Sequence, residues 1–276
     1  MFNYVHGLGG RARMSPRELM LPLPSLADYI SFHRGRLGLT RPALAKRAYV
    51  SIGTITKLER GEQTGLNPST LNSLAEALEL TTADERRHLD ELTRVHIPRP
   101  WFPQELRSEV TEHERAMLDA LMPQPAAYCN ERWDVVAANE AYEALFPGRL
   151  EAVNAMRWLF SPAGRAAIVD WETEAAADVA RMRGILAHFG NPAVGVALLS
   201  QLQSDPDFAR LWLERRVRFD RAVDEPEHVH TASGPVSVTM QLQSLPAQVD
   251  WLHLVIAVVH PYSGPPTFDA PVDDRS

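Results

Sequence analysis

The chain has 276 residues, of which 45% are hydrophobic and 23% are charged, and its formal net charge is −7. This is the composition of an ordinary soluble, globular protein, and it excludes a disordered or fibrous chain. The length allows two domains, one small and one larger.

Cysteine content and hydropathy bear on the compartment. The only cysteine is Cys129, so an intrachain disulfide is excluded and a reducing compartment is expected. The first 15 residues lack the continuous apolar core of a signal peptide. The longest apolar run, Trp251 to Val259, is interrupted by His253 and is too short to span a bilayer. We therefore expect a cytoplasmic protein that does not bind membranes.

Charge is divided unevenly along the chain. Residues 1–96 hold 13 Lys and Arg against 10 Asp and Glu, a net charge of +3. The remainder holds 15 against 25, a net charge of −10. Both lysines, Lys46 and Lys57, lie in the stretch 40–61. The asymmetry favours a basic DNA-binding unit joined to an acidic domain, although a charge of +3 is small enough to arise by chance.

Residues 1–24 are rich in glycine and proline and show no sustained hydrophobic period. We predict a flexible arm there, because chain termini usually fray. From Ser25 the apolar spacing is helical, and five short helices are predicted within residues 25–95. Thr40 and Ser51 are the predicted N-caps of the second and third helices, and Gly61 ends the third. Two such helices around a tight turn form a helix-turn-helix unit, whose second helix lies in the DNA major groove.

Residues 26–94 resemble the bacterial Xre/phage-repressor-type DNA-binding domain. The segments that carry the resemblance are TITKLERG (Thr54–Gly61) and LNSLAEALEL (Leu71–Leu80). The resemblance implies a double-stranded DNA operator as partner. The chain departs from the family at Tyr49, where the family usually has glycine. If the backbone there has positive φ, a tyrosine costs roughly 1–2 kcal/mol.

The N-terminal face of the second helix in this unit is expected to meet the bases. Lys57 can donate hydrogen bonds to guanine O6 and N7, and Ile52 can contact a thymine methyl group. The residues expected on this face are Ile52, Gly53, Thr56 and Lys57. The resemblance implies contacts to the DNA backbone from Arg41, Ser51, Thr54 and Arg60. The alternative is that Lys57 and Arg60 are solvated helix charges.

A proline-rich stretch separates the two halves, and we place a stiff linker at residues 96–104. In residues 105–262, two predicted strands form a hairpin, helices follow, and three strands return. Residues 263–276 are predicted to be a disordered tail. The expected fold class is multidomain: an all-α five-helix helix-turn-helix domain, followed by an α+β PAS-like domain with an antiparallel sheet and a large helical insert.

The second half also resembles a known family. The segments PAAYCNERWDVVAANEAYEALF, NAMRWLFSP, DWETEAAADVARMRG, DPDFARLWLERRV and VSVTMQLQSLP resemble the ligand-binding domain of MmyB-like transcription regulators. The resemblance implies a PAS-like small-molecule sensor, with a fatty acid as one ligand class. The chain has His230-Thr231 where the family often has His-Pro, and Arg215-Arg216 where it has a histidine after Trp212. Both departures leave open which residues bind the polar end of the ligand.

Aromatic and aliphatic stripes in this half are able to enclose an apolar cavity, in which an acyl chain would gain roughly 0.8 kcal/mol per buried methylene. The candidate lining residues are Trp158, Phe160, Trp171, Leu186, Phe208, Trp212, Met240 and Leu254. Arg157 or His230 is the candidate for holding a ligand carboxylate. The alternatives are that the stripes only fill a core and that each polar residue is a structural hydrogen-bonding group.

The sequence therefore predicts a ligand-responsive transcription regulator that acts as a homodimer and needs no cofactor. Two rival interpretations stay open: the C-terminal domain only dimerises, or it is a metal-dependent cupin-type sensor using His228 and His230. A cupin needs a further carboxylate and histidine, and no Glu follows within ten residues of His230. No phosphate loop, nucleophile elbow or Cys–His arrangement indicates an enzyme, and no metal site is predicted.

Overall fold

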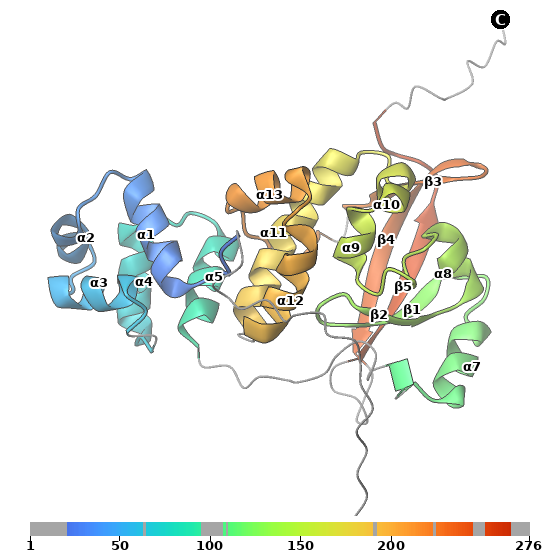
Figure 1. The fold of residues 1–276 in the computed structure, drawn as a ribbon, viewed down its shortest axis with the longest axis horizontal. Coiled ribbons are helices and arrows are strands. Elements are labelled where there is room, and N and C mark those ends of the chain that lie inside the picture. Colours follow the sequence, from blue (N-terminus) through green and yellow to red (C-terminus); the bar gives the residue numbers. More distant parts are fainter. Residues whose placement is uncertain are drawn as a thin grey trace, which may run out of the picture.

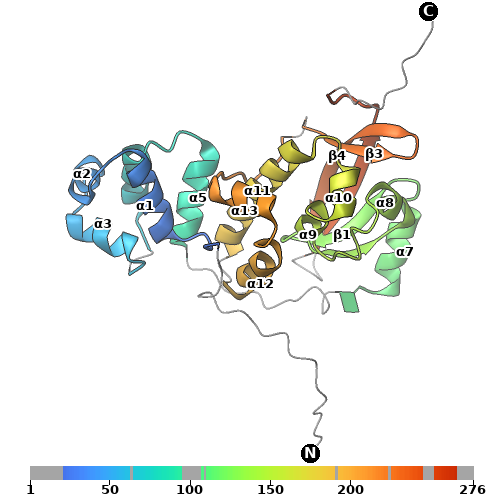
Figure 2. The ribbon, with the colours of Figure 1, turned by 45° about the horizontal axis from the view of Figure 1, so that its top comes forward.

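The computed structural model describes residues 21–62, 65–94, 107–108, 110–189, 192–222, 225–244 and 252–265. A helical domain forms one end of the molecule and a β-sheet the other, with the long helix α11 (Trp171–Phe189) between them (Figure 1; Figure 2). The predicted linker, residues 1–20 of the predicted arm and residues 266–276 of the predicted tail lie outside the described residues. In the part of the chain that is described, no helix is long and apolar enough to cross a membrane.

The described N-terminal domain consists of five helices that close around one leucine-rich core. They are α1 (Leu26–Arg36), α2 (Arg41–Arg47), α3 (Ile52–Glu59), α4 (Pro68–Ala77) and α5 (Ala83–Thr93). Each begins at a residue whose side-chain oxygen accepts a hydrogen bond from a backbone N–H of the first turn. These capping residues are Ser25, Thr40, Ser51, Asn67 and Thr82. Helices α2 and α3 are the predicted helix-turn-helix pair.

The turn between α2 and α3 has the backbone conformation that usually requires glycine. Tyr49 has a φ of 54° and its side chain is 91% exposed. The Val50 N–H donates to the Ala45 carbonyl at 3.0 Å, and the Tyr49 N–H donates to the Lys46 carbonyl at 3.4 Å. These two bonds close the C-terminal end of α2 as a Schellman motif, in which Tyr49 is the left-handed residue. The motif brings Ala45, the third-last residue of α2, next to Val50. Tyr49 therefore has the positive φ that makes a tyrosine costly at this position.

The C-terminal domain is an α+β domain with a five-stranded antiparallel sheet, which confirms the predicted fold class. Its strands are β1 (Ala126–Asn130), β2 (Val135–Ala138), β3 (Glu227–Thr231), β4 (Gly234–Ser244) and β5 (Leu252–His260). They lie in the order β2-β1-β5-β4-β3. Helix α7 (Glu112–Ala120) precedes the sheet. Between β2 and β3 the chain forms α8 (Glu140–Leu145), α9 (Ala155–Leu159), α10 (Pro162–Ala167), α11, α12 (Pro192–Leu202) and α13 (Pro206–Leu213).

Local contacts set where β2 and α11 begin. Trp133 has a φ of 62° and lies in the turn before β2. The side-chain oxygen of Asn130 accepts from the N–H groups of Arg132 and Asp134 at 2.9 and 3.0 Å, which holds this turn closed. Ile168 lies just before α11 and pairs with Val229 of β3 as an isolated bridge.

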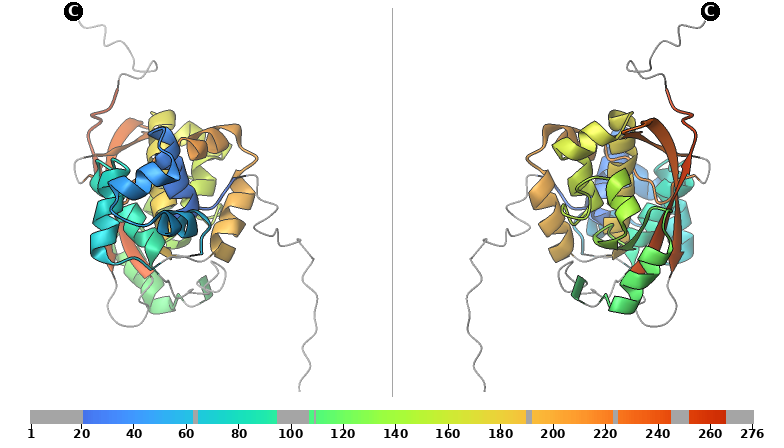
Figure 3. Two further views of the ribbon diagram at one scale, coloured as in Figure 1. Left: turned by 90° about the vertical axis from the view of Figure 1, so that its left-hand side faces the viewer. Right: turned by 90° about the vertical axis from the view of Figure 1, so that its right-hand side faces the viewer.

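Each face of the sheet has its own apolar core. Helices of the insert cover the inner face, and Val238, Val255 and Ala257 belong to the larger core there. On the outer face Leu252 and Leu254 of β5 pack in a smaller core with Leu118 of α7. Figure 3 shows most helices gathered on one side of the strands. The insert and the inner face therefore form the interior of this domain.

Candidate functional site

The surface formed by α2 and α3 is the candidate DNA interface. Ile52 at the first turn of α3 is 52% exposed, although it is a large apolar residue. Lys57, five residues further along α3, is also exposed. An exposed apolar side chain followed by a cation on the same helix suits contact with base edges, which present both methyl groups and hydrogen-bond acceptors.

The structure brings the eight predicted DNA-binding residues onto these two helices and their caps. Ser51, Gly53 and Arg60 are exposed, and Thr54 and Thr56 are half-buried. The Ser51 hydroxyl caps α3 by accepting from the Thr54 N–H at 3.0 Å. The Thr56 hydroxyl donates to the Ile52 carbonyl at 2.9 Å. Three of the predicted polar residues are thus also used to build the helix itself.

A buried carboxylate fixes the position of α3. The side chain of Glu59 is fully buried and accepts hydrogen bonds from Nε of Arg34 and Nε of Arg41, each at 2.5 Å. Burial by itself raises the pKa of Glu59, but the bonds from the two arginines outweigh it and hold the pKa below its ordinary value. Arg41 keeps about half of its side chain exposed, so it joins α2 to α3 while facing solvent.

The interior of the C-terminal domain contains a continuous series of aromatic rings. Phe160 lies edge-on to Trp171 and to Phe208, with ring centroids 5.3 and 5.2 Å apart. Phe208 in turn stacks on Trp212 at 5.7 Å. All four belong to or pack against the larger core. The series leads from α9 and α11 to α13.

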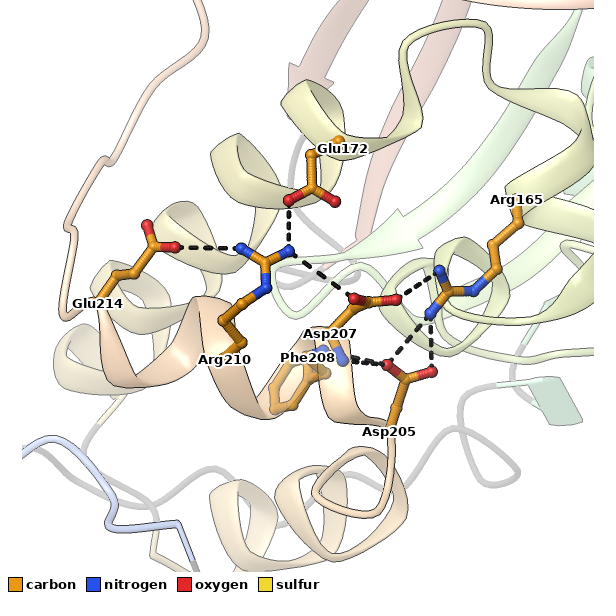
Figure 4. Close-up of polar contacts among 7 residues, drawn as sticks. All are labelled: Arg165, Glu172, Asp205, Asp207, Phe208, Arg210 and Glu214. Atoms are coloured by element: carbon orange, nitrogen blue, oxygen red, sulfur yellow. Dashed lines mark hydrogen bonds and ion pairs between the residues drawn. The ribbon is translucent and has the colours of Figure 1, made fainter.

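An ion-pair network holds the helices that carry these rings. Arg165 of α10 bonds Asp205 at 3.0 Å and Asp207 at 2.8 Å, and its guanidinium lies 3.8 Å from the Trp171 ring centroid. Asp205 also caps α13 by accepting from the Phe208 N–H at 3.0 Å. Arg210 of α13 reaches Glu172 of α11, as Figure 4 shows. The network therefore locks α10, α11 and α13 into one unit.

Of the ten residues predicted to bind ligand, seven lie in or against this interior core. They are Trp158, Phe160, Trp171, Leu186, Phe208, Trp212 and Met240. The other three lie elsewhere. Leu254 is on the outer face of the sheet, because alternate residues of β5 point to opposite faces. Arg157 and His230 are exposed, so neither side chain is placed to hold a carboxylate in this core.

The histidine pair of β3 does not form a metal centre with its described neighbours. His228 shares a hydrogen bond with the Ser237 hydroxyl at 3.0 Å and lies edge-on to Tyr262. Within the described ranges, no group of three or more His, Cys, Asp or Glu side chains is arranged to hold a metal ion. The open sheet with its helical insert is also not the barrel that the cupin interpretation requires.

The comparisons with known proteins agree with this architecture. Residues 110–265 match the family described as MmyB-like transcription regulator ligand binding domain, and residues 25–89 match a helix-turn-helix domain. The chain belongs to the MmyB-like transcription regulators. It is a DNA-binding transcription regulator with a ligand-binding domain. The comparison with individually curated proteins finds no match.

In this MmyB-like regulator the DNA-binding domain packs directly on the ligand-binding domain. Arg215 binds the carboxylate of Asp28 with both terminal nitrogens, Nη2 at 3.0 Å from Oδ1, and lies 4.6 Å from the Phe32 ring centroid. Arg87 of α5 bonds Asp220 at 3.2 Å. We call these contacts, together with the packing of α5 on α11, the domain junction.

The segment just before α1 enters the core of the ligand-binding domain. Leu21 is 4% exposed and belongs to the larger interior core, and Leu23 packs against it. The Trp212 Nε1–H donates to the Pro22 carbonyl at 3.0 Å. The last residues of the predicted 1–24 arm are therefore packed, because two leucines and a backbone acceptor find partners in the second domain. This segment forms part of the junction.

The sequence interpretation missed a group of buried arginines in the ligand-binding domain. Arg149, Arg181 and Arg183 each have at least one buried side-chain nitrogen without a hydrogen-bond acceptor among the described residues. Arg181 and Arg183 interrupt the apolar stripe of α11, which was the available signal. Charged residues on the buried face of a helix are rare unless they are paired, and they often have a function.

Proposed function

We propose that this MmyB-like regulator is a switch in which a small apolar ligand, of the fatty-acid class, alters sequence-specific operator binding by a homodimer. The observation that carries the proposal is the domain junction. Trp212, the last ring of the interior aromatic series, holds the segment that leads into α1. A ligand that moves these rings would act directly on the DNA-binding domain.

The dimer follows from the size of the DNA interface. One helix-turn-helix unit covers only a half-site, and two half-sites about 34 Å apart let a dimer bind successive turns of the DNA helix. A change at the junction would alter the spacing or the freedom of the two units. Coupling of this kind is typically about 1–3 kcal/mol.

The first test is mass spectrometry of the purified protein. Native spectra should show a dimer, and denaturing extraction should release an apolar acid that is absent from a mock purification. A monomer at micromolar concentration would contradict the dimer. Purified protein that carries no apolar molecule, and takes up none from a panel of fatty acids, would contradict ligand sensing. That result would favour the alternative in which the C-terminal domain only dimerises.

A further inference from the structure

Arg149 of the ligand-binding domain carries two buried guanidinium nitrogens that have no acceptor among the described residues. It lies in the loop between α8 and α9, where the Trp158 Nε1–H donates to the Pro147 carbonyl at 2.8 Å and anchors the loop on α9. The Nε and Nη1 atoms of Arg149 are buried, and in the described part of the chain neither has a hydrogen-bond partner. Leaving a buried charged donor unsatisfied is costly, and such groups are rare in folded proteins.

Aromatic rings surround this guanidinium. Its central carbon lies 4.7 Å from the ring centroid of Phe146, 4.9 Å from that of Trp158 and 6.0 Å from that of Tyr142. Ring faces attract a cation, but they do not accept its in-plane N–H bonds as an oxygen does. The N–H donors on Nε and Nη1 are therefore available to bind another group.

In the ranges that the structure describes, no neighbouring anion bonds these two nitrogens. Burial raises the pKa of Cys129 to about 12 and also raises the pKa of Tyr142, so both are neutral at physiological pH. The pKa of Arg149 is raised overall even though burial lowers it, so the guanidinium stays charged. The buried carboxylate of Glu174 is already engaged by Arg221.

A second arginine of the same domain, this one on α11, also has a buried donor without a described acceptor. Arg181 of α11 is 4% exposed, and its Nη1 has no hydrogen-bond partner among the described residues. Its Nη2 donates to Asp178. Within the described ranges, unused buried donors thus occur on two elements of this domain, the loop between α8 and α9 and helix α11.

We propose that Arg149 binds the carboxylate of the ligand, whose apolar part lies among the interior aromatic rings. This inference rests on the proposed function, because it assigns the polar end of the same ligand. A carboxylate offers two oxygens in the geometry that a guanidinium prefers. The site replaces Arg157 and His230, which are exposed, as the anchor for the acid group.

The test compares two probes of equal chain length, decanoate and 1-decanol, by calorimetric titration of the full chain. Wild-type protein should bind decanoate more tightly than 1-decanol. Arg149→Met keeps an unbranched apolar stem but removes the guanidinium with its charge and donors. It should weaken decanoate binding at least tenfold and leave 1-decanol binding unchanged. Arg157→Met, the matched control on the exposed arginine, should bind both probes like wild type.

The outcomes separate the inference from the function on which it rests. If wild type binds neither probe, the proposed apolar-ligand function fails and the inference fails with it. If wild type binds both and Arg149→Met keeps its preference for decanoate, the inference alone is wrong. If Arg149→Met weakens the binding of both probes equally, Arg149 has a structural role and the inference is also wrong. Arg149→Lys, which keeps the charge, is the second variant if Arg149→Met does not fold, and it should retain a reduced preference for decanoate.

Discussion

Tyr49 concentrates backbone strain at a single residue. An L-residue in the left-handed region costs roughly 1–2 kcal/mol, whereas glycine adopts that region freely. Because the Tyr49 side chain is 91% exposed, removing it loses little packing. The strain is therefore the main contribution of this residue to stability.

We expect Tyr49→Gly to raise the free energy of unfolding by about 1 kcal/mol, since glycine relieves the strain but also loosens the unfolded chain. Urea denaturation of the full chain, followed by the helical signal, measures this change. Tyr49→Ala keeps the β-carbon and hence the strain, so it should gain little. Equal stabilisation by both variants would show that the strain is not the cause.

Glu59 gives the helix-turn-helix pair a defined dependence on pH. Its folded-state pKa lies below the ordinary value, so the unfolded state binds more protons as the pH falls through the ordinary range of a glutamate carboxyl. The stability that Glu59 contributes is therefore present at neutral pH and is lost on acidification.

Glu59→Gln should destabilise the protein by about 2 kcal/mol at neutral pH, because two charge-assisted bonds become neutral ones. The difference from wild type should shrink as the pH falls below the ordinary pKa of a glutamate carboxyl. Denaturation curves across this pH range measure it, with Glu62→Gln as an exposed control on the same surface. A difference that is constant with pH would contradict the role of the Glu59 charge.

At the scale of elements, α3 is expected to separate base reading from phosphate contact. Lys57→Ala should reduce discrimination between operator and unrelated DNA by about 1–3 kcal/mol. Arg41→Ala should instead lower the slope of log affinity against log salt by about one unit. Binding titrations on operators selected from random DNA measure both quantities. Arg216→Ala, far along the sequence in the other domain, is the control, and equal behaviour of all three variants would contradict the assignment.

Sequence patterns predicted the elements well because their causes are local. Capping residues such as Thr40 and Thr82, and the apolar period that follows them, fix where helices begin and which side is buried. The position of seven of the ten ligand-site candidates in or against the interior core was predicted for the same reason. The buried position of Arg149 and the packing of Leu21 depend on contacts between segments far apart in the chain, which no local pattern encodes.

At the scale of the whole molecule, the domain junction combines an ion pair with a shared core. The Arg215 and Asp28 side chains are 23% and 33% exposed, so their interaction is only partly screened by solvent. Asp28→Asn combined with Arg215→Gln should loosen the DNA-binding domain and increase the maximum dimension in small-angle X-ray scattering. Arg47→Gln, which breaks a pair with Glu79 inside one domain, is the control. An unchanged profile for the double variant would contradict the role of this pair.

The central claim is that ligand binding in one domain alters DNA binding by the other. Fluorescence anisotropy of a selected operator duplex, titrated with wild-type protein with and without saturating decanoate, tests it most directly. Coupling of about 1–3 kcal/mol predicts that affinity changes roughly 5- to 150-fold. The Asp28→Asn, Arg215→Gln double variant should show a smaller change. Operator affinity that stays the same while decanoate is bound would contradict the claim.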